Sequence, residues 1–422
     1  MLASFHKGNR ERLYAMLPEN SLLVLFSGEE QRKTNDEFWP FYADRSFVYL
    51  TGIAQKESVL LCMRESGSSW TERLYLLPSD PMAERWTGRR LTMQEAEEKS
   101  GIRDIRPISA FSADFHTLAA GGHYSLPSGH YQNLWLDLYK ASPNDGEKPA
   151  DRFLNQAQRQ YPYLKIGNAN ALLRRLRLIK QPCEIEAMRK AESITREGIL
   201  AMMRASKPGM WEYQYKAEFD RALGQFSPDG PAFPSIISSG ENNFCIHYYS
   251  YIGQAQDGDM ILNDVGAQWD NVMTDVSRGF PCNGRFTDRQ RRLWECVLAT
   301  SNHMFGRIKP GFPMAEVDAE IRRYNADRLV EAGALDKAEH IGRLMWHGGA
   351  HHVGWDVHDV VERPETVAPG MVFCIDVGVY HEEWGIGFRL EDNLLVTETG
   401  CENLSAAIPR TVEDIEAVMR KG

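Results

Sequence analysis

The stretch Met260-Ile-Leu-Asn-Asp-Val-Gly-Ala-Gln-Trp-Asp-Asn-Val-Met-Thr-Asp-Val-Ser-Arg-Gly-Phe280 decides the fold of this chain. Apolar residues alternate with polar ones through two runs, which is typical of the two strands of a hairpin rather than of a helix. Each run leads to a carboxylate, Asp264 in the first and Asp275 at the second. Because a carboxylate within an apolar strand is costly unless a cation meets it, the stretch indicates a metal ion or a buried arginine.

A second copy of this pattern follows later in the chain. Residues 369–378 repeat the Asp-Val-Gly of 264–266 behind a similar apolar run, and the next strand supplies Glu391. Each copy is preceded by Lys-Pro-Gly, at 207–209 and at 309–311, between two helical segments. The matching order predicts that the C-terminal half is an internal duplication with two carboxylates in each copy.

Length and composition restrict the class of protein. A chain of 422 residues exceeds what one hydrophobic core usually organises, so we expect two domains. Hydrophobic residues at 43% and charged residues at 25% are ordinary for a globular protein. The net charge of −10 argues against a nucleic-acid partner, which would require a basic face.

The cysteines and the hydropathy pattern indicate a cytoplasmic protein. Seven cysteines are scattered without any Cys-x-x-Cys pair, as is usual for reduced thiols. No signal peptide is recognised, and no apolar run approaches the length of a membrane span. We therefore expect no membrane partner.

The expected domains are residues 1–175 and 176–422. The first alternates short apolar strands with helices and predicts a mixed α/β domain. Its expected strands are 22–26, 46–50, 59–63 and 74–77. In the second, Pro182 opens a helix that ends at the first Lys-Pro-Gly.

A cluster of histidines lies between the two hairpins. His347, His351, His352 and His358 fall within twelve positions, and a cluster beside carboxylate hairpins indicates a metal centre. Four carboxylates with one or two imidazoles suit Mn²⁺, Co²⁺, Fe²⁺ or Zn²⁺. Their charge is better balanced by two ions, roughly 3.5–4 Å apart, that share bridging carboxylates. Arg389 shares a strand face with Glu391 and is interpreted as steadying the ligands.

In this order, Asp264, Asp275, His351, the acidic Asp376 and Glu391 resemble the ligand set of the pita-bread metallopeptidases. The closest likeness is to the Xaa-Pro aminopeptidases, also called aminopeptidase P, and it covers nearly the whole chain. The motifs that carry the likeness are Tyr49-Leu-Thr-Gly52, Trp86-Thr-Gly-Arg-Arg90, Ser239-Gly-Glu-Asn242, Asp275-Val-Ser-Arg-Gly-Phe-Pro281, His351-His-Val-Gly-Trp-Asp-Val-His358 and Gly385-Ile-Gly-Phe-Arg-Leu-Glu391.

The resemblance implies a fold and a reaction. The fold would be an N-terminal creatinase-like mixed α/β domain followed by a duplicated pita-bread domain, with helices outside a curved antiparallel sheet. The reaction would be removal of an N-terminal residue that precedes proline, with two divalent ions, Mn²⁺ first among the candidates, activating a water molecule.

The resemblance also implies individual roles. Asp264 would hold one ion, Asp275 and Glu391 would bridge both, and His351 with Asp376 would hold the other. By the same resemblance, His247 and His358 would hold the substrate and steady the scissile carbonyl, and His347 would face the proline side. The chain would form a homodimer or homotetramer in which Trp86 reaches the active site of a neighbouring subunit.

One departure from the family pattern leaves alternatives open. Asp376-Val377-Gly378 stands where the family has Glu-Pro-Gly, and that glutamate is both a ligand and the proton carrier. The alternatives are a prolidase restricted to Xaa-Pro dipeptides and a pita-bread binding protein with weakened catalysis. A creatinase-like amidinohydrolase is a weaker option, because creatinase lacks this ligand set.

Overall fold

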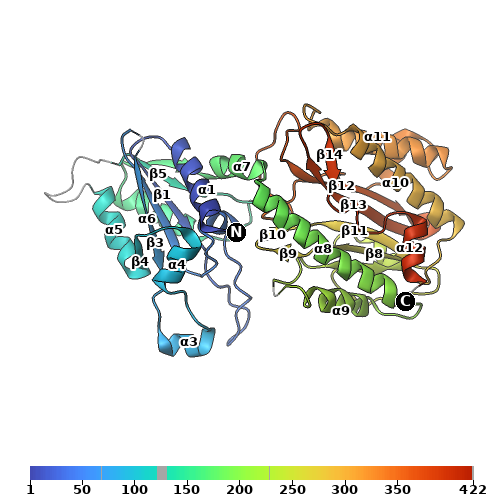
Figure 1. The fold of residues 1–422 in the computed structure, drawn as a ribbon, viewed down its shortest axis with the longest axis horizontal. Coiled ribbons are helices and arrows are strands. Elements are labelled where there is room, and N and C mark those ends of the chain that lie inside the picture. The colour runs from blue at the N-terminus through green and yellow to red at the C-terminus, as the bar shows by residue number, and fades with distance from the viewer. Residues whose placement is uncertain (68, 121–130, 228, 421–422) are drawn as a thin grey trace. The chain divides into compact units, whose positions relative to one another are not determined.

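The computed structural model describes residues 1–67, 69–120, 131–227 and 229–420 and contains two compact units (Figure 1). The units are Met1–Leu176 and Arg177–Gly422, and helix α7 (Asn170–Leu178) runs across the division. Within the described ranges, every helix is too short or too polar to span a lipid bilayer.

The first unit is built on one mixed sheet of six strands in the order β4-β3-β2-β1-β5-β6. Strand β1 pairs in antiparallel fashion with β2 and in parallel fashion with β5, so the sheet changes direction at its centre. Its strands are β1 (Ser21–Phe26), β2 (Val59–Arg64), β3 (Trp70–Leu76), β4 (Ile105–Pro107), β5 (Asn133–Leu136) and β6 (Lys165–Asn168). Its other helices are α1 (Ala3–Met16), α2 (Arg45–Thr51), α3 (Pro81–Thr87), α4 (Met93–Ser100), η1 (Ile108–Ala110), α5 (Phe111–Ala119) and α6 (Pro149–Gln160).

Helices cover both faces of this sheet. On one face Leu22 and Val24 of β1 pack with Phe111 and Phe115 of α5 in a single core. On the other face, α1 is attached to β3 through Glu72. The Arg10 Nε and the Tyr14 hydroxyl donate to its carboxylate at 2.8 and 3.0 Å.

The prediction of a strand at 46–50 is wrong, because these residues form helix α2. Asp44 accepts a hydrogen bond from the Phe47 N–H at 3.0 Å and so begins the helix as its N-cap. Gly52 ends it at a φ of 69°. A side chain at Gly52 would be blocked as well, because its Cβ would lie 2.7 Å from the His6 Nε2.

The second unit contains two three-stranded antiparallel sheets, in the orders β11-β8-β7 and β12-β13-β14. Their strands are β7 (Ile236–Ser239), β8 (Met260–Val265), β11 (Val276–Pro281), β12 (Val372–His381), β13 (Ile386–Val396) and β14 (Cys401–Asn403), with a small β9 (Gln268–Trp269) and β10 (Val272–Met273) hairpin between. The helices are α8 (Pro182–Ala205), α9 (Glu212–Leu223), α10 (Asp288–Arg307), α11 (Glu316–Glu331) and α12 (Val412–Met419), with short η2 (Gly240–Phe244), η3 (Ala338–Arg343) and η4 (Glu382–Trp384).

The two expected carboxylate hairpins are confirmed and face one another. Asp264 of β8 lies opposite Ser277 of β11, and Asp376 of β12 lies opposite Glu391 of β13. The sheets meet where β11 runs beside β13, and there the Arg278 Nη1 donates to the Glu391 carbonyl at 2.7 Å. The β8–β11 hairpin of one sheet therefore presents its carboxylates to the β12–β13 hairpin of the other.

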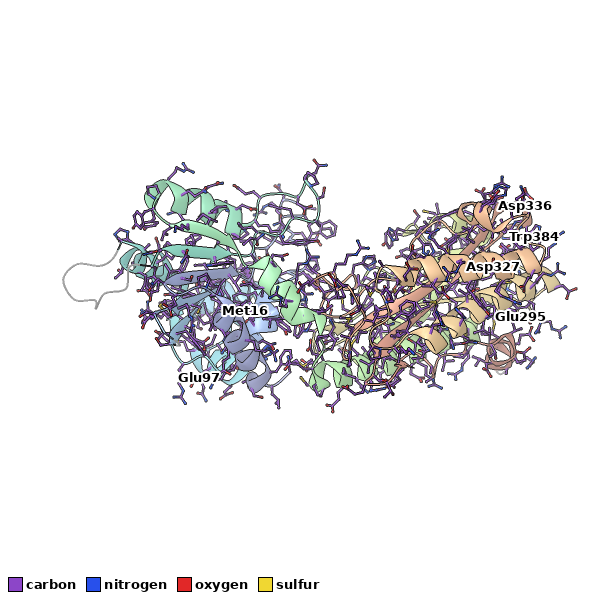
Figure 2. The ribbon with its side chains drawn as sticks, turned by 90° about the horizontal axis from the view of Figure 1, so that it is seen from above. Met16, Glu97, Glu295, Asp327, Asp336 and Trp384 are labelled. Atoms are coloured by element: carbon purple, nitrogen blue, oxygen red, sulfur yellow. The ribbon has the colours of Figure 1, made fainter. Side chains whose placement is uncertain are left out.

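Helix pairs α8–α9 and α10–α11 lie outside the sheets, as Figure 1 shows. Gly198 allows the first pair to approach closely, because a Cβ there would lie 2.4 Å from the Phe219 ring. The outer face of the second pair is polar, with Glu295 and Asp327 exposed (Figure 2).

A buried ion cluster fixes the segment that carries the histidines. The Lys180 Nζ donates to the Asp359 carboxylate at 2.7 Å, and Arg177 pairs with the same carboxylate. Burial alone would raise the pKa of Asp359, but Arg177 and Lys180 outweigh it and lower the pKa to about 2. The Asp359 N–H donates to the His352 carbonyl at 2.8 Å, which closes the segment into a loop.

Substitution Asp359→Asn should destabilise the protein by about 3–5 kcal/mol, because it leaves the buried Lys180 without its carboxylate and the buried Arg177 with Asp356 alone. Asp356→Asn removes a half-exposed partner of the same Arg177 and should cost about 1 kcal/mol or less. Chemical denaturation measures both, and equal losses would contradict this account.

Low pH should destabilise the folded protein by protonating the same carboxylate, that of Asp359. Because the folded-state pKa is depressed, the Asp359 contribution is complete above its ordinary value and is lost as the pH falls toward about 2. The stability of Asp359→Asn should therefore depend less on pH in this window than that of the parent protein.

Candidate metal centre

Three carboxylates and one imidazole converge where the two sheets meet. Oxygen atoms of Asp264, Asp275 and Glu391 all lie within 4.8 Å of one another. The His351 Nε2 lies 3.4 Å from the Asp275 Oδ2 and 3.5 Å from the Glu391 Oε1. Four of the five residues named by the ligand resemblance are thus brought together.

One oxygen of each of the three carboxylates is left without a partner. The Oδ1 atoms of Asp264 and Asp275 and the Oε1 of Glu391 are buried without a hydrogen-bond donor. Burial, followed by the nearby Glu391 and Asp264 charges, raises the pKa of Asp275 well above its ordinary value. Orphaned oxygens of like charge fit divalent cations, which satisfy both the charge and the lone pairs.

Arg389 lies two positions before Glu391 on β13 and contacts the cluster from the same strand face. Its Nη2 donates to the Asp264 Oδ2 at 2.7 Å and its Nη1 to the Tyr380 hydroxyl at 2.8 Å. It also reaches the Ser277 Oγ and the carbonyl of Ile246. One guanidinium therefore orients a ligand and ties three elements of the site together.

Asp376 lies opposite Glu391 in the hairpin and pairs with a histidine through one oxygen, while its Oδ1 is buried without a hydrogen-bond donor. Its Oδ2 lies 3.1 Å from the His347 Nδ1. Burial alone would lower the pKa of His347, but Asp376 outweighs it and the pKa is raised. Gly378 makes room for this contact, because a Cβ there would lie 2.3 Å from the His347 Nε2. Asp376 belongs to none of the groups of three converging ligand residues among the described residues.

The remaining histidines mark the open side of the site. His358 is exposed and stacks on His351, with ring centroids 3.8 Å apart and planes 18° from parallel. Burial and the neighbouring His351 lower the pKa of His358. His247 is also exposed and stacks on Tyr249 at 6.3 Å.

Sequence reasoning missed one residue that lies beside the ligands. Cys374 belongs to a converging group with His351 and Glu391, and its place two residues before Asp376 on one strand face was a usable signal. Trp86 belongs to the first unit, on α3, and its side chain is 86% exposed.

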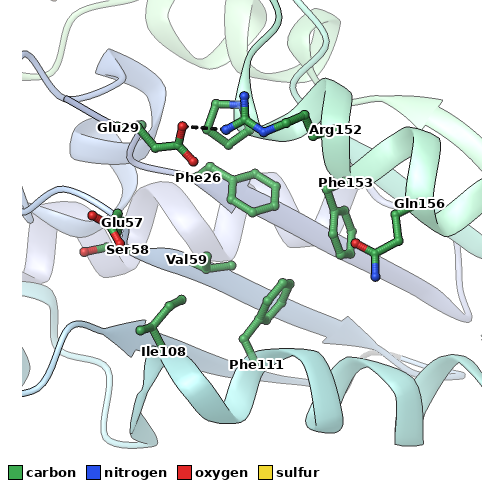
Figure 3. Close-up of a pocket in the computed structure, with 12 residues that line it drawn as sticks. Phe26, Glu29, Glu57, Ser58, Val59, Ile108, Phe111, Arg152, Phe153 and Gln156 are labelled. Carbon is green, nitrogen blue, oxygen red and sulfur yellow. Dashed lines mark hydrogen bonds and ion pairs between the residues drawn. The ribbon is translucent and has the colours of Figure 1, made fainter. Parts of the chain in front are cut away.

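Two cavities accompany these elements, each within one unit. A cavity of about 300 Å³ lies beside the centre and includes His351, His352 and Asp359 in its wall. Another, of about 290 Å³, lies in the first unit over the rings of Phe26, Phe111 and Phe153. Figure 3 shows that the ion pair of Glu29 and Arg152 crosses the rim of this second cavity. Its lining contains no histidine or cysteine, so the carboxylate and histidine cluster remains the candidate centre.

The two joined antiparallel sheets, with helices outside and carboxylates and a histidine between them, define a metal-dependent hydrolase of pita-bread architecture. The family description "Metallopeptidase family M24" matches residues 186–398, and "Aminopeptidase P, N-terminal domain" matches residues 6–125. The chain belongs to metallopeptidase family M24.

Similar proteins support the same assignment. The chain is 30% identical over 437 aligned positions to an Xaa-Pro aminopeptidase of Haemophilus influenzae, covering 97% of this chain and 96% of that one. The low-pH form of Escherichia coli aminopeptidase P matches it with a TM-score of 0.90 at 27% identity, over 100% of this chain and 99% of the other. The zinc-substituted Escherichia coli aminopeptidase P in complex with product matches with a TM-score of 0.89 at 28% identity, over the same shares. The expected fold class is confirmed.

The substitution Arg389→Lys tests whether Arg389 holds the metal ligands in place. A lysine cannot reproduce the fork that meets Asp264 and Tyr380, so the affinity for divalent metal should fall on the order of 10- to 100-fold. Competition with a chelating dye measures this affinity. Arg291→Lys alters a partly exposed arginine of the same unit, which pairs with Glu413 away from the ligands, and serves as the control. Unchanged metal affinity in a folded Arg389→Lys protein would contradict the role.

Proposed function

We propose that this chain is an Xaa-Pro aminopeptidase that uses two divalent ions to remove an N-terminal residue preceding proline. The observation that carries the proposal is the convergence of Asp264, Asp275, Glu391 and His351, with buried carboxylate oxygens left unpartnered. Similarity to Xaa-Pro aminopeptidases along nearly the whole chain supports the substrate class.

The residues fit two ions that share carboxylates. Asp264 would serve one ion and His351 the other, with Asp275 and Glu391 between them, since both lie near His351 as well as near Asp264. Such ions activate a water molecule and polarise a carbonyl oxygen. The oxygen-rich set suits Mn²⁺, and the zinc-substituted relative shows that zinc can be introduced into a protein of similar structure.

The chain's own side chains supply the other requirements of peptide hydrolysis. His358 and His247 lie exposed at the open side, where they can hold the carbonyl of the bond to be cleaved. Asp376, paired with His347, is the acidic group in position to carry a proton. A proline ring would then lie toward His347.

The alternatives have less support. Neither the dipeptide-restricted prolidase nor the weakened binding protein is favoured by the similar proteins described above, and the crowded carboxylate set argues against a simple binding role. The seven cysteines are all free, which agrees with the expected cytoplasmic location.

A metal and peptide screen tests the proposed function. Chelation should abolish cleavage of a Xaa-Pro-Xaa peptide, and Mn²⁺ or Co²⁺ should restore it, because the nucleophile depends on bound metal. The same peptide with alanine for proline is the substrate control. Asp264→Asn should lose metal and activity together. Full activity in chelator, or no cleavage with two bound ions, would reject the proposal.

The shorter acid at position 376 gives a second test. Its carboxylate would lie about 1.5 Å back from that of a glutamate, one C–C bond length, and misplacement of about 1 Å can cost about 100-fold in rate. Asp376→Glu should therefore raise turnover while metal content stays nearly unchanged. Asp327→Glu makes the same change on the exposed side of α11 and should leave turnover unaltered. Lower turnover or metal loss in Asp376→Glu would show a strand adapted to aspartate.

The oligomeric state of the protein gives a third test. Trp86 is the most exposed of the tryptophans, and Arg85 precedes it on α3. If it reaches the site of another subunit, the protein will sediment as a dimer or tetramer, and Trp86→Ala will lose activity toward peptides. Trp39→Ala changes another exposed tryptophan of the same unit and is the control. A monomer with fully active Trp86→Ala would refute the arrangement.

A further inference from the structure

The thiol of Cys374 points at the metal centre. Cys374 lies two residues before Asp376 on β12, so that both side chains stand on the face that meets Glu391. The Cys374 side chain is fully buried. Its sulfur, the His351 imidazole and a Glu391 oxygen lie within 4.8 Å of one another.

Two hydrogen bonds tie Cys374 to His351, one of them to the sulfur. The His351 N–H lies 3.3 Å from the Cys374 Sγ, and the Cys374 N–H donates to the His351 carbonyl at 2.9 Å. The Glu391 Oε1 nearby is buried and unpartnered, in a residue only 2% exposed. An unsatisfied carboxylate oxygen aimed at the same space indicates that a cation completes the group.

The distances allow all three atoms to bind one ion. Donors on one zinc ion can be no farther apart than the sum of two bond lengths, about 4.4 Å for sulfur and nitrogen. A separation of at most 4.8 Å therefore requires only small side-chain adjustments. Asp376, the residue expected to complete this position, pairs with His347 through one oxygen and is absent from this converging group, although its Oδ1 is buried without a partner.

We propose that Cys374 is a sulfur ligand of the ion held by His351, so that the two metal positions differ in preference. This inference rests on the proposed di-metal function. On coordination the S–H bond is replaced by a sulfur–metal bond, and the proton is released to the buffer. The position served by Asp264 has only oxygen ligands and favours Mn²⁺, whereas sulfur favours Zn²⁺ or Co²⁺ at the His351 position.

Cobalt substitution of the unaltered protein tests this ligand directly. A protein loaded with Co²⁺ should show a near-ultraviolet sulfur-to-cobalt charge-transfer band, and Cys374→Ser should lose that band. Cys296→Ser removes another buried thiol of the same unit and should keep it. Bound Co²⁺ without such a band in the unaltered protein would overturn the inference and leave the proposed function intact. A protein that binds Mn²⁺ but no Co²⁺ would overturn the inference alone, and one that binds neither ion would overturn both.

Metal competition supplies a second readout. Cys374→Ser should weaken Zn²⁺ binding by more than about tenfold, since loss of even a ligand-supporting group costs 10- to 100-fold. Binding of Mn²⁺ at the Asp264 position should change by far less. Equal effects on Zn²⁺ and Mn²⁺, or none on either, would show that Cys374 only packs against the site.

Discussion

Repulsion among buried carboxylates is the constraint on which the second unit depends. Asp275 and Glu391 are almost completely buried, and Asp264 lies against them. Asp264 and Glu391 stand on strands β8 and β13, and Asp275 directly precedes β11, beside a hydrophobic core. Only Asp264 receives a guanidinium directly, from Arg389. The remaining charge requires cations, and the fold around it is arranged to hold those cations rather than to avoid the repulsion.

Strand β13 carries charge on both of its faces. Glu391 faces the metal centre, whereas the next residue, Asp392, faces the opposite side and pairs with Arg278 at 2.6 Å and Arg410 at 2.8 Å. Behind them, Glu192 accepts a hydrogen bond from the Ser405 Oγ at 2.9 Å. Burial and the Asp392 charge raise the pKa of Glu192 to about 8, so it stands protonated at neutral pH. Negative charge in this layer is thus met by arginine at Asp392 and by a proton at Glu192, and the carboxylates of the centre are left for metal.

The sequence was sufficient for the parts of this arrangement that follow from local pattern. Alternation in the two hairpins, and the order of their carboxylates and histidines, identified the strands and the cluster they form. The run at 46–50 was misread because a short buried apolar run has no distinguishing period, and the deciding features were the Asp44 cap and Gly52. The pairing of Asp376 with His347 depends on contacts across the fold, which no local pattern records.

The joining of two distant hairpins also determines when the site can exist during synthesis. Arg389 and Asp264 are 125 positions apart, and Ser277 and Glu391 are 114 positions apart. A ribosome that has completed α11 has released one carboxylate hairpin but not the other. Contacts of such long range are slow to close, and metal affinity arises only in the folded state. A metal centre that needs both hairpins can therefore form only after the C-terminal strands have left the ribosome.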